Sequence, residues 1–313
     1  AAAKLSTLTS DTLCSSDDPI VYKPTPLPAR TYSMAVVTKN KSDEEKVGMA
    51  MHRLIEQDPT LHIRRDPEIR QTIISGMGDT HLDVAVQRMR TMSKIEVELV
   101  QARIPYHETI TKKGTGVYRH KKQSGGRGQF GEVHLRLEPL PEGEEFQFDW
   151  EVVGGNIPTK FQASVEKGVH EAMDRGILAG YRAVDIKAVC YDGKHHDVDS
   201  SDMAFKMAAS MGFRQVAREC APIILEPIFN LTVTVPEAFM GDIMGDISGR
   251  RGKILGSEQQ NSKTVVKAQV PLAEMSTYTQ DLRSMTQGRG TFETEYSHYE
   301  RVPADVQAKI IEE

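Results

Sequence analysis

The order of predicted strands and helices is the feature that most limits what this chain can fold into. Residues 31–100 alternate between strand-like and helix-like periodicity in the order β-α-β-β-α-β, and residues 229–299 repeat that order. In the first unit, one helix carries apolar side chains on a single face, namely Val47, Ala50, Met51, Leu54 and Ile55. Two such units predict two ferredoxin-like α+β domains.

Turn residues and apolar spacing set the expected elements of both units. In the first unit, a capping box of Ser42 and Glu45 is expected at the start of the first helix. Its strands are predicted at 31–37, 61–65, 71–75 and 95–100, and its second helix at 79–91. In the second unit, strands are predicted at 229–235, 253–259, 263–270 and 291–299, and helices at 236–248 and 272–287.

Between these units lies a different pattern, which predicts a third α+β module. Its strands are expected at 133–138 and 146–153, and a helix at 160–175 should bury Phe161, Val165, Val169 and Met173. A second helix at 200–218, capped by Asp199 and Ser200, should pack a methionine stripe into the core: Met203, Met207 and Met211. The predicted organisation is a remnant of a preceding domain with a proline-rich linker at 1–28, then domains at 29–104, 105–226 and 227–313.

Composition excludes few functions, but one missing motif is informative. The chain has a net charge of −5, which argues against general coating of nucleic acid and leaves a local basic patch open. Its three cysteines match no metal spacing, and no apolar run approaches the ~20 residues of a membrane helix. Gly-Lys occurs at 193–194 and 252–253 without a following Ser or Thr, so the sequence contains no P-loop for a nucleoside triphosphate.

Residues 111–133 form an unusually basic stretch. Between residues 112 and 127 it has no acid and six basic residues: Lys112, Lys113, Arg119, Lys121, Lys122 and Arg127. Two interpretations stand: a solvated hairpin, or a surface that contacts phosphates. Gly126–Gly131 matches G-x-G-x-x-G, but the alternating residues after it predict a strand rather than the helix of a dinucleotide site. The glycines therefore predict a tight hairpin tip, with Arg127 and Gln129 as its hydrogen-bonding side chains.

Residues 192–202 read DGKHHDVDSSD and allow three interpretations. Adjacent His195 and His196 could hold a metal, as in a metal-dependent hydrolase, but their spacing is poor and no further motif supports them. Acid–base catalysis would need a pocket that the sequence does not reveal. We therefore expect a loop tip in which His196 and Asp197 project and can contact RNA.

Three more basic residues follow a predicted helix: Arg250, Arg251 and Lys253. Cations at a helix C-terminus interact favourably with its dipole, whereas cations on a surface can contact RNA. The sequence leaves both roles open.

Several motifs, in this order, resemble those of translation elongation factor G. They are GMGDTHLDV at 76–84, KQSGGRGQFG at 122–131, LAGY at 178–181, HDVDSS at 196–201, GDIMGD at 241–246 with RRG at 250–252, and PLAEM with LRSMTQGRG within 271–290. The resemblance implies the end of domain II followed by domains III, IV and V, with a ribosomal-protein-S5-like α+β domain between the two ferredoxin-like domains. It also implies that the GTPase domain, with its GTP and Mg²⁺, lies outside this sequence.

The resemblance further implies a role for particular residues. Two loops would form the tip of domain IV and contact the tRNA–mRNA duplex and the decoding region: Ser124, Gly125, Gly126, Arg127, Gly128 and Gln129, with His195, His196 and Asp197. Residues 241–253 would meet large-subunit rRNA and stalk-base proteins, and residues 71–83 would relay signals from the GTPase core. We expect no catalytic site, no cofactor and no membrane contact in this chain, and a monomeric, cytoplasmic factor that promotes GTP-dependent translocation.

Two segments depart from the family pattern. Ser248–Gly252 reads SGRRG where the family usually has SRRRG, and residues 290–296 are more acidic than the usual ending. A paralogue specialised for ribosome recycling is therefore an alternative to the translocase. A stand-alone RNA-binding module is another.

Overall fold

The computed structural model describes residues 7, 9–38, 44–123 and 128–312. The chain forms two compact units. The first contains residues 1–104 and 228–298, and the second contains residues 105–227 and 299–313. Both mix strands and helices, which confirms the predicted α+β class. No helix among the described residues is long and apolar enough to cross a membrane.

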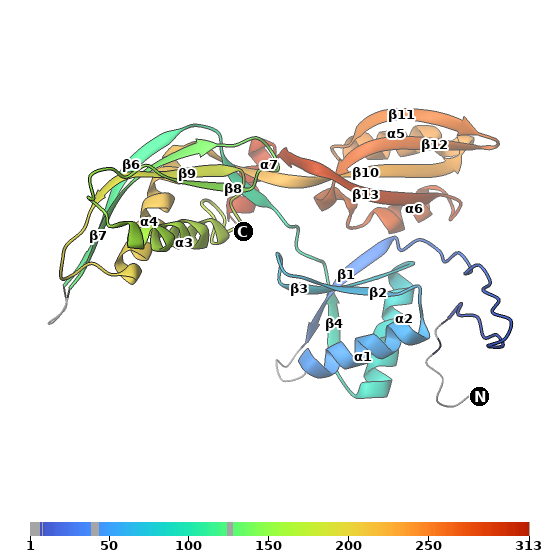
Figure 1. The fold of residues 1–313 in the computed structure, drawn as a ribbon. Helices are drawn as coiled ribbons and strands as arrows, with labels where there is room; N and C mark the ends of the chain where they lie inside the picture. Colours follow the sequence, from blue (N-terminus) through green and yellow to red (C-terminus); the bar gives the residue numbers. More distant parts are fainter. Residues whose placement is uncertain (1–6, 8, 39–43, 124–127, 313) are drawn as a thin grey trace. The chain divides into compact units, whose positions relative to one another are not determined.

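The first β-α-β-β-α-β unit is confirmed. Its sheet has the order β2-β3-β1-β4 and is antiparallel throughout. The strands are β1 (Tyr32–Thr38), β2 (His62–Asp66), β3 (Gln71–Gly76) and β4 (Val97–Val100), and the helices are α1 (Glu44–Gln57) and α2 (Asp79–Ser93). Both helices cover one face of the sheet (Figure 1), and α1 buries Val47, Ala50, Met51 and Leu54. Ser42 and the side chain of Glu45 lie outside the described residues, so the capping box stays a prediction.

The second β-α-β-β-α-β unit repeats that strand order as β11-β12-β10-β13. Its strands are β10 (Pro222–Pro236), β11 (Lys253–Gln260), β12 (Lys263–Pro271) and β13 (Thr291–Arg301). The first predicted helix is a 3₁₀ turn (Glu237–Phe239) leading into α5 (Met240–Gly249), and the second is a 3₁₀ turn (Leu272–Met275) followed by α6 (Tyr278–Met285). Strand β10 is longer than predicted, because Pro222–Leu225 pair with β5 (His107–Ile110) in the second unit.

The second unit holds the candidate site on a sheet ordered β6-β7-β9-β8. Its strands are β6 (Gly114–Lys122), β7 (Gln129–Pro139), β8 (Phe146–Trp150) and β9 (Ile186–Lys194), and only the β8–β9 pair is parallel. A 3₁₀ turn (Thr159–Phe161) leads into α3 (Gln162–Asp174), and α4 (Asp202–Glu219) lies beside α3 on one face of the sheet (Figure 1). Phe161, Val165, Val169 and Met173 are buried as predicted.

A C-terminal helix that the sequence did not suggest, α7 (Ala304–Glu312), also belongs to this unit. Residues 299–313 thus pack in the second unit, although the sequence grouped them with the last domain. Val302 and Ile310 form a small buried cluster with Ile224, against which Tyr106 and Tyr181 pack. The cluster joins segments from distant parts of the chain, which explains why local periodicity did not reveal it.

The methionine stripe of α4 was predicted wrongly. Met203, Met207 and Met211 are 54%, 38% and 40% exposed. The buried face of α4 instead carries Ala204, Phe205, Ala208, Ala209, Gly212, Phe213, Val216 and Ala217. Alanine and glycine are needed at several positions of this face because the helix lies very close to its neighbours: a Cβ on Gly212 would lie 3.1 Å from the Cβ of Tyr118. Methionine side chains would hold α4 away from the sheet.

A buried carboxylate organises the LAGY segment beside this core. Glu108 of β5 is 0% exposed and accepts hydrogen bonds from four backbone N–H groups of one turn. The donors are Ile177, Leu178 at 2.7 Å, Ala179 at 2.8 Å and Tyr181 at 3.0 Å. Such a cradle satisfies a charge that burial would otherwise destabilise. Glu108 therefore holds the 177–181 turn in place.

Candidate nucleic-acid interface

Two loops of the second unit meet at one end of its sheet. One is the β6–β7 hairpin, whose strands pair as far as Lys122 and Gln129, and the other connects β9 to α4. Phe130 N donates to Asp199 O at 2.9 Å, and Ser200 Oγ donates to Phe130 O at 2.9 Å. The structure thus joins Gly128 and Phe130 of the hairpin to Asp199 and Ser200, which directly follow the His195–Asp197 segment. Ser124–Arg127, which complete the predicted hairpin tip, lie outside the described residues.

The Asp199 side chain strengthens this junction. Its Oδ1 accepts a hydrogen bond from Gly128 N at 3.0 Å. A Cβ at position 128 would lie 3.1 Å from the carboxyl carbon of Asp199, so the contact favours glycine there. The prediction that Asp199 and Ser200 cap α4 is therefore wrong. Ser201 is the N-cap, and its Oγ accepts from Ala204 N at 3.3 Å.

The two adjacent histidines have opposite surroundings. His195 faces acceptors: its Nδ1 lies 2.9 Å from Asn156 O, and its Nε2 lies 3.2 Å from Asp197 Oδ1. His196 faces donors, because its Nδ1 accepts from the backbone N–H groups of Val198 and Asp199, each at 3.3 Å. Three of the four ring nitrogens are thus engaged by the protein itself. Among the described residues, no group of three His, Cys, Asp or Glu side chains is placed to hold a metal ion.

Exposure distinguishes the residues that can reach a partner. The side chain of His196 is 55% exposed and that of Asp197 is 94% exposed, whereas that of His195 is 31% exposed. Gln129, which was predicted to bind a partner, places its Oε1 3.0 Å from His120 Nε2. The junction therefore offers one imidazole and one carboxylate to solvent.

The basic residues of the β6 region fall into two groups. Arg119 pairs with the buried Glu132, and Lys113 Nζ lies 3.1 Å from Glu138 Oε2. Burial alone would raise the pKa of Glu132, but hydrogen bonds from Arg119 and His134 and the charge of Arg119 outweigh it and hold this pKa below its usual value. A second group is exposed, and the described residues give it no ion pair: Lys112, Lys121 and Lys122. This second group carries the positive charge available to a polyanion.

Arg250 and Arg251 are engaged within their own domain. Arg250 is 14% exposed and bonds to Asp246 Oδ2 at 2.8 Å and Asp281 Oδ2 at 2.6 Å, so it ties α5 to α6. Its guanidinium carbon also lies 5.1 Å from the centre of the Tyr278 ring. Arg251 Nε lies 2.8 Å from Glu274 Oε1, whereas Lys253 is exposed on β11. The geometry gives Arg250 a structural role, and an RNA contact by Lys253 stays a prediction.

A histidine in the first unit also holds a loop, which the sequence did not suggest. His81 Nδ1 accepts from Met77 N at 3.1 Å, and its Nε2 lies 3.0 Å from Asp58 Oδ2. Burial alone would raise the pKa of Asp58, but hydrogen bonds from Thr60 and His81 outweigh it and lower this pKa. A Cβ on Gly76 would lie 2.7 Å from His81 Nδ1. The GMGDTHLDV motif thus builds a compact β3–α2 connection.

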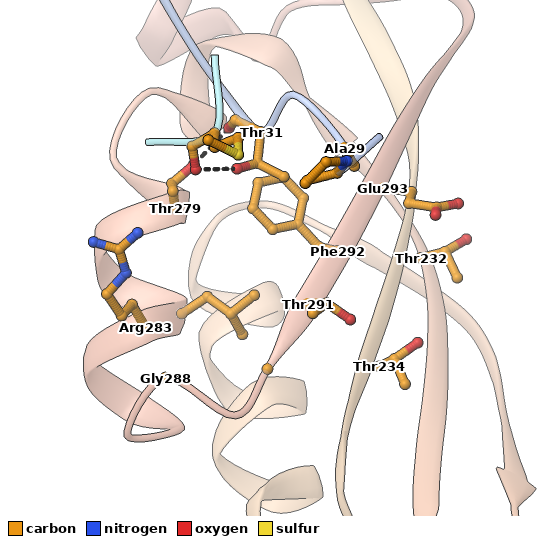
Figure 2. Close-up of a pocket in the computed structure, with 14 residues that line it drawn as sticks. Ala29, Thr31, Thr232, Thr234, Thr279, Arg283, Gly288, Thr291, Phe292 and Glu293 are labelled. Atoms are coloured by element: carbon orange, nitrogen blue, oxygen red, sulfur yellow. Dashed lines mark hydrogen bonds between the residues drawn. The ribbon is translucent and has the colours of Figure 1, made fainter. Parts of the chain in front are cut away.

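The first unit contains a cavity of about 540 Å³ (Figure 2). It is lined by residues before β1, by Met77, and by β10, α6 and β13. Thr279 Oγ1 donates to Thr31 O at 2.6 Å across its wall (Figure 2). Threonine hydroxyls and glycines dominate the lining, and Arg283 and Glu293 are its charged residues. The sequence did not suggest this cavity, because its walls come from segments about 200 residues apart.

Comparisons with known proteins agree with this architecture. Residues 27–101 match the model of elongation factor G domain III, residues 102–221 match domain IV, and residues 223–310 match the elongation factor G C-terminus. The crystal structure of ttk003000868 from Thermus thermophilus is similar at 41% sequence identity with a TM-score of 0.79. The match covers 92% of this chain and 43% of the Thermus chain, so this chain spans less than half of that protein's length. The chain therefore belongs to the elongation factor G family, of which it carries domain III, domain IV and the C-terminal domain.

Proposed function

We propose that this chain is the ribosome-engaging part of an elongation factor that promotes translocation of tRNA and mRNA. In this proposal, the junction of the two loops enters the decoding region and contacts the codon–anticodon duplex. One observation carries it: Asp199 and Ser200 bind the β6–β7 hairpin and thereby present His196 and Asp197 together at one end of the domain.

The mechanics follow from how the loops are anchored. Both loops begin at strands of the same sheet, namely β6, β7 and β9, and α4 packs closely on β6 and β7. Phe130 N donates to Asp199 O and Phe130 O accepts from Ser200 Oγ, so the two loops are joined and would move together with the domain. Such an arm can occupy space vacated by the moving duplex and oppose its return. Lys112, Lys121 and Lys122 would attract the phosphate backbone.

GTP chemistry is assigned elsewhere in this proposal. The sequence has no P-loop, so GTP and Mg²⁺ would be bound by a GTPase domain outside these residues. Domain III and the C-terminal domain would connect that domain to rRNA of both subunits and to stalk-base proteins. The factor would act in the cytoplasm as a monomer.

The test compares translocation with GTP hydrolysis in the full-length factor. His196→Ala should slow single-turnover translocation by about fivefold, because one hydrogen bond is worth about 1 kcal/mol, and should leave ribosome-stimulated GTP hydrolysis unchanged. His52→Ala is the matched control, since His52 is also exposed, at 81%, but lies on α1. Equal loss of both activities in His196→Ala, or no loss of either, would overturn the proposal.

A second candidate is ribosome recycling, and the surface of β13 favours it. Glu293 and Glu295 are exposed on this strand, where the resemblance leads us to expect a less acidic segment. Wild-type factor that hydrolyses GTP on ribosomes without translocating them, and that splits the subunits instead, would support recycling over translocation.

A further inference from the structure

The hydrogen bonds around His196 determine which of its nitrogens carries the proton. Two backbone N–H groups point at Nδ1, from Val198 and Asp199. A neutral imidazole that accepts at Nδ1 must carry its proton on Nε2. The carboxylate of Asp199 is farther from Nδ1, at 3.6 Å, which is too long for a hydrogen bond. Among the described residues no hydrogen bond engages Nε2, and the side chain is 55% exposed, so His196 presents an N–H donor to its surroundings.

Asp199 connects this tautomer to the hairpin. Its backbone N–H donates to His196 Nδ1, its carbonyl accepts from Phe130 N, and its Oδ1 accepts from Gly128 N. The backbone of His196 is tied as well, because its N–H donates to Ser200 Oγ at 2.8 Å. These bonds hold the 196–200 turn against β7, so the N–H groups that face Nδ1 cannot turn away independently.

We propose that Asp199 is a positioning residue that fixes His196 as the Nε2–H tautomer, so that His196 meets RNA as a hydrogen-bond donor. This inference rests on the proposed function. The matching groups on RNA are acceptors: the ribose 2′-hydroxyl oxygen and the N3 and O2 atoms on the minor-groove edges of bases. Asp197, whose carboxylate pairs with His195, projects beside it and would repel a phosphate placed there. The site thus favours the minor-groove side of a duplex over its backbone.

The tautomer can be measured directly. Long-range ¹H–¹⁵N spectra of the ¹⁵N-histidine-labelled chain, at about two pH units above the ordinary histidine pKa of about 6.5, report which nitrogen is protonated. The His196 signals are assigned by their absence in His196→Gln. Wild type should show a single Nε2–H form. Asp199→Ala should show both tautomers, whereas Asp199→Asn, which keeps Oδ1 as an acceptor, should resemble wild type.

Gly128→Ala disturbs the same contact from the other side, because its Cβ would press on the Asp199 carboxyl. It should also mix the tautomers, and it serves as a second variant if Asp199→Ala folds poorly. A single Nε2–H form in both Asp199→Ala and Gly128→Ala would overturn the inference.

Translocation by the full-length factor separates this inference from the proposed function. Asp199→Ala should slow translocation by only about twofold, because about half of the molecules keep the Nε2–H form, and the double variant should be no slower than His196→Ala alone. Multiplied losses in the double variant would contradict positioning through His196. Mixed tautomers with unchanged translocation in Asp199→Ala and His196→Ala would leave the positioning role standing and overturn the proposed function.

Discussion

Replacing Glu108 should destabilise the second unit more than almost any other single change. Its carboxylate is fully buried and accepts four backbone hydrogen bonds from the 177–181 turn. Removing this carboxylate leaves four backbone N–H groups without their acceptor, and each buried donor left unsatisfied costs about 1–3 kcal/mol. Because Leu178, Ala179 and Tyr181 are only partly buried, water can accept hydrogen bonds from some of their N–H groups in the variant. We therefore expect Glu108→Ala to lower the free energy of unfolding by about 4 kcal/mol.

The chain contains a convenient reporter for this unit. Its single tryptophan, Trp150, lies in β8 and packs against the core of the second unit, so its fluorescence in a urea titration follows that unit. Glu108→Gln should lose about 3 kcal/mol, because its amide group would face two backbone N–H donors. Glu166→Ala, an exposed glutamate on α3, is the control and should change stability by less than about 0.5 kcal/mol. A Glu108→Ala transition indistinguishable from the control would refute the reasoning.

Two further predictions use the same reporter. The pKa of Glu132 is lower in the folded than in the unfolded chain, where it is about 4.5, so its ionised form stabilises the fold above that pH. This stabilisation is lost as the pH falls through the folded pKa. Glu132→Gln should therefore have a lower free energy of unfolding than wild type at neutral pH. The difference should shrink below about pH 4.5, and a difference independent of pH would contradict the Arg119 interaction. On α4, Met207→Gln should change stability by less than about 0.5 kcal/mol, whereas Phe205→Ala should cost about 3–5 kcal/mol. A larger loss of stability in Met207→Gln than in Phe205→Ala would indicate that the methionine stripe is the buried face of α4.

Much of the fold could be predicted because local periodicity carries it. Alternating and helical apolar spacing located both β-α-β-β-α-β units, since the face that a residue occupies depends on its position within the element. The α1 face at Val47–Leu54 was correct for this reason. The tip of the β6–β7 hairpin was also predictable, because clustered glycines are followed by residues that alternate as in a strand. The family motifs then identified the domains without any knowledge of contacts.

Only part of the candidate site could be predicted from local sequence patterns. The sequence singled out both loops, yet it assigned Asp199 and Ser200 to a helix cap. In the structure their side chains bind the hairpin instead, and Ser201 caps α4. Either use satisfies the local preference of Asp and Ser for backbone N–H and C=O groups. Local preference therefore could not choose between them.

By itself, the sequence determined the order of the elements and the family. It also determined the buried face of those helices that carry a single row of apolar residues. Tertiary structure decided which of two neighbouring stripes on α4 became the core, what Glu108 holds, and how His195 and His196 differ. Periodicity depends on residues a few positions apart, and a short window contains them. The backbone N–H groups that bind Glu108 lie 69 to 73 positions away, the backbone N–H that binds Asp199 lies 71 positions away, and the carbonyl beside His195 lies 39 positions away. Only the folded chain brings those partners together.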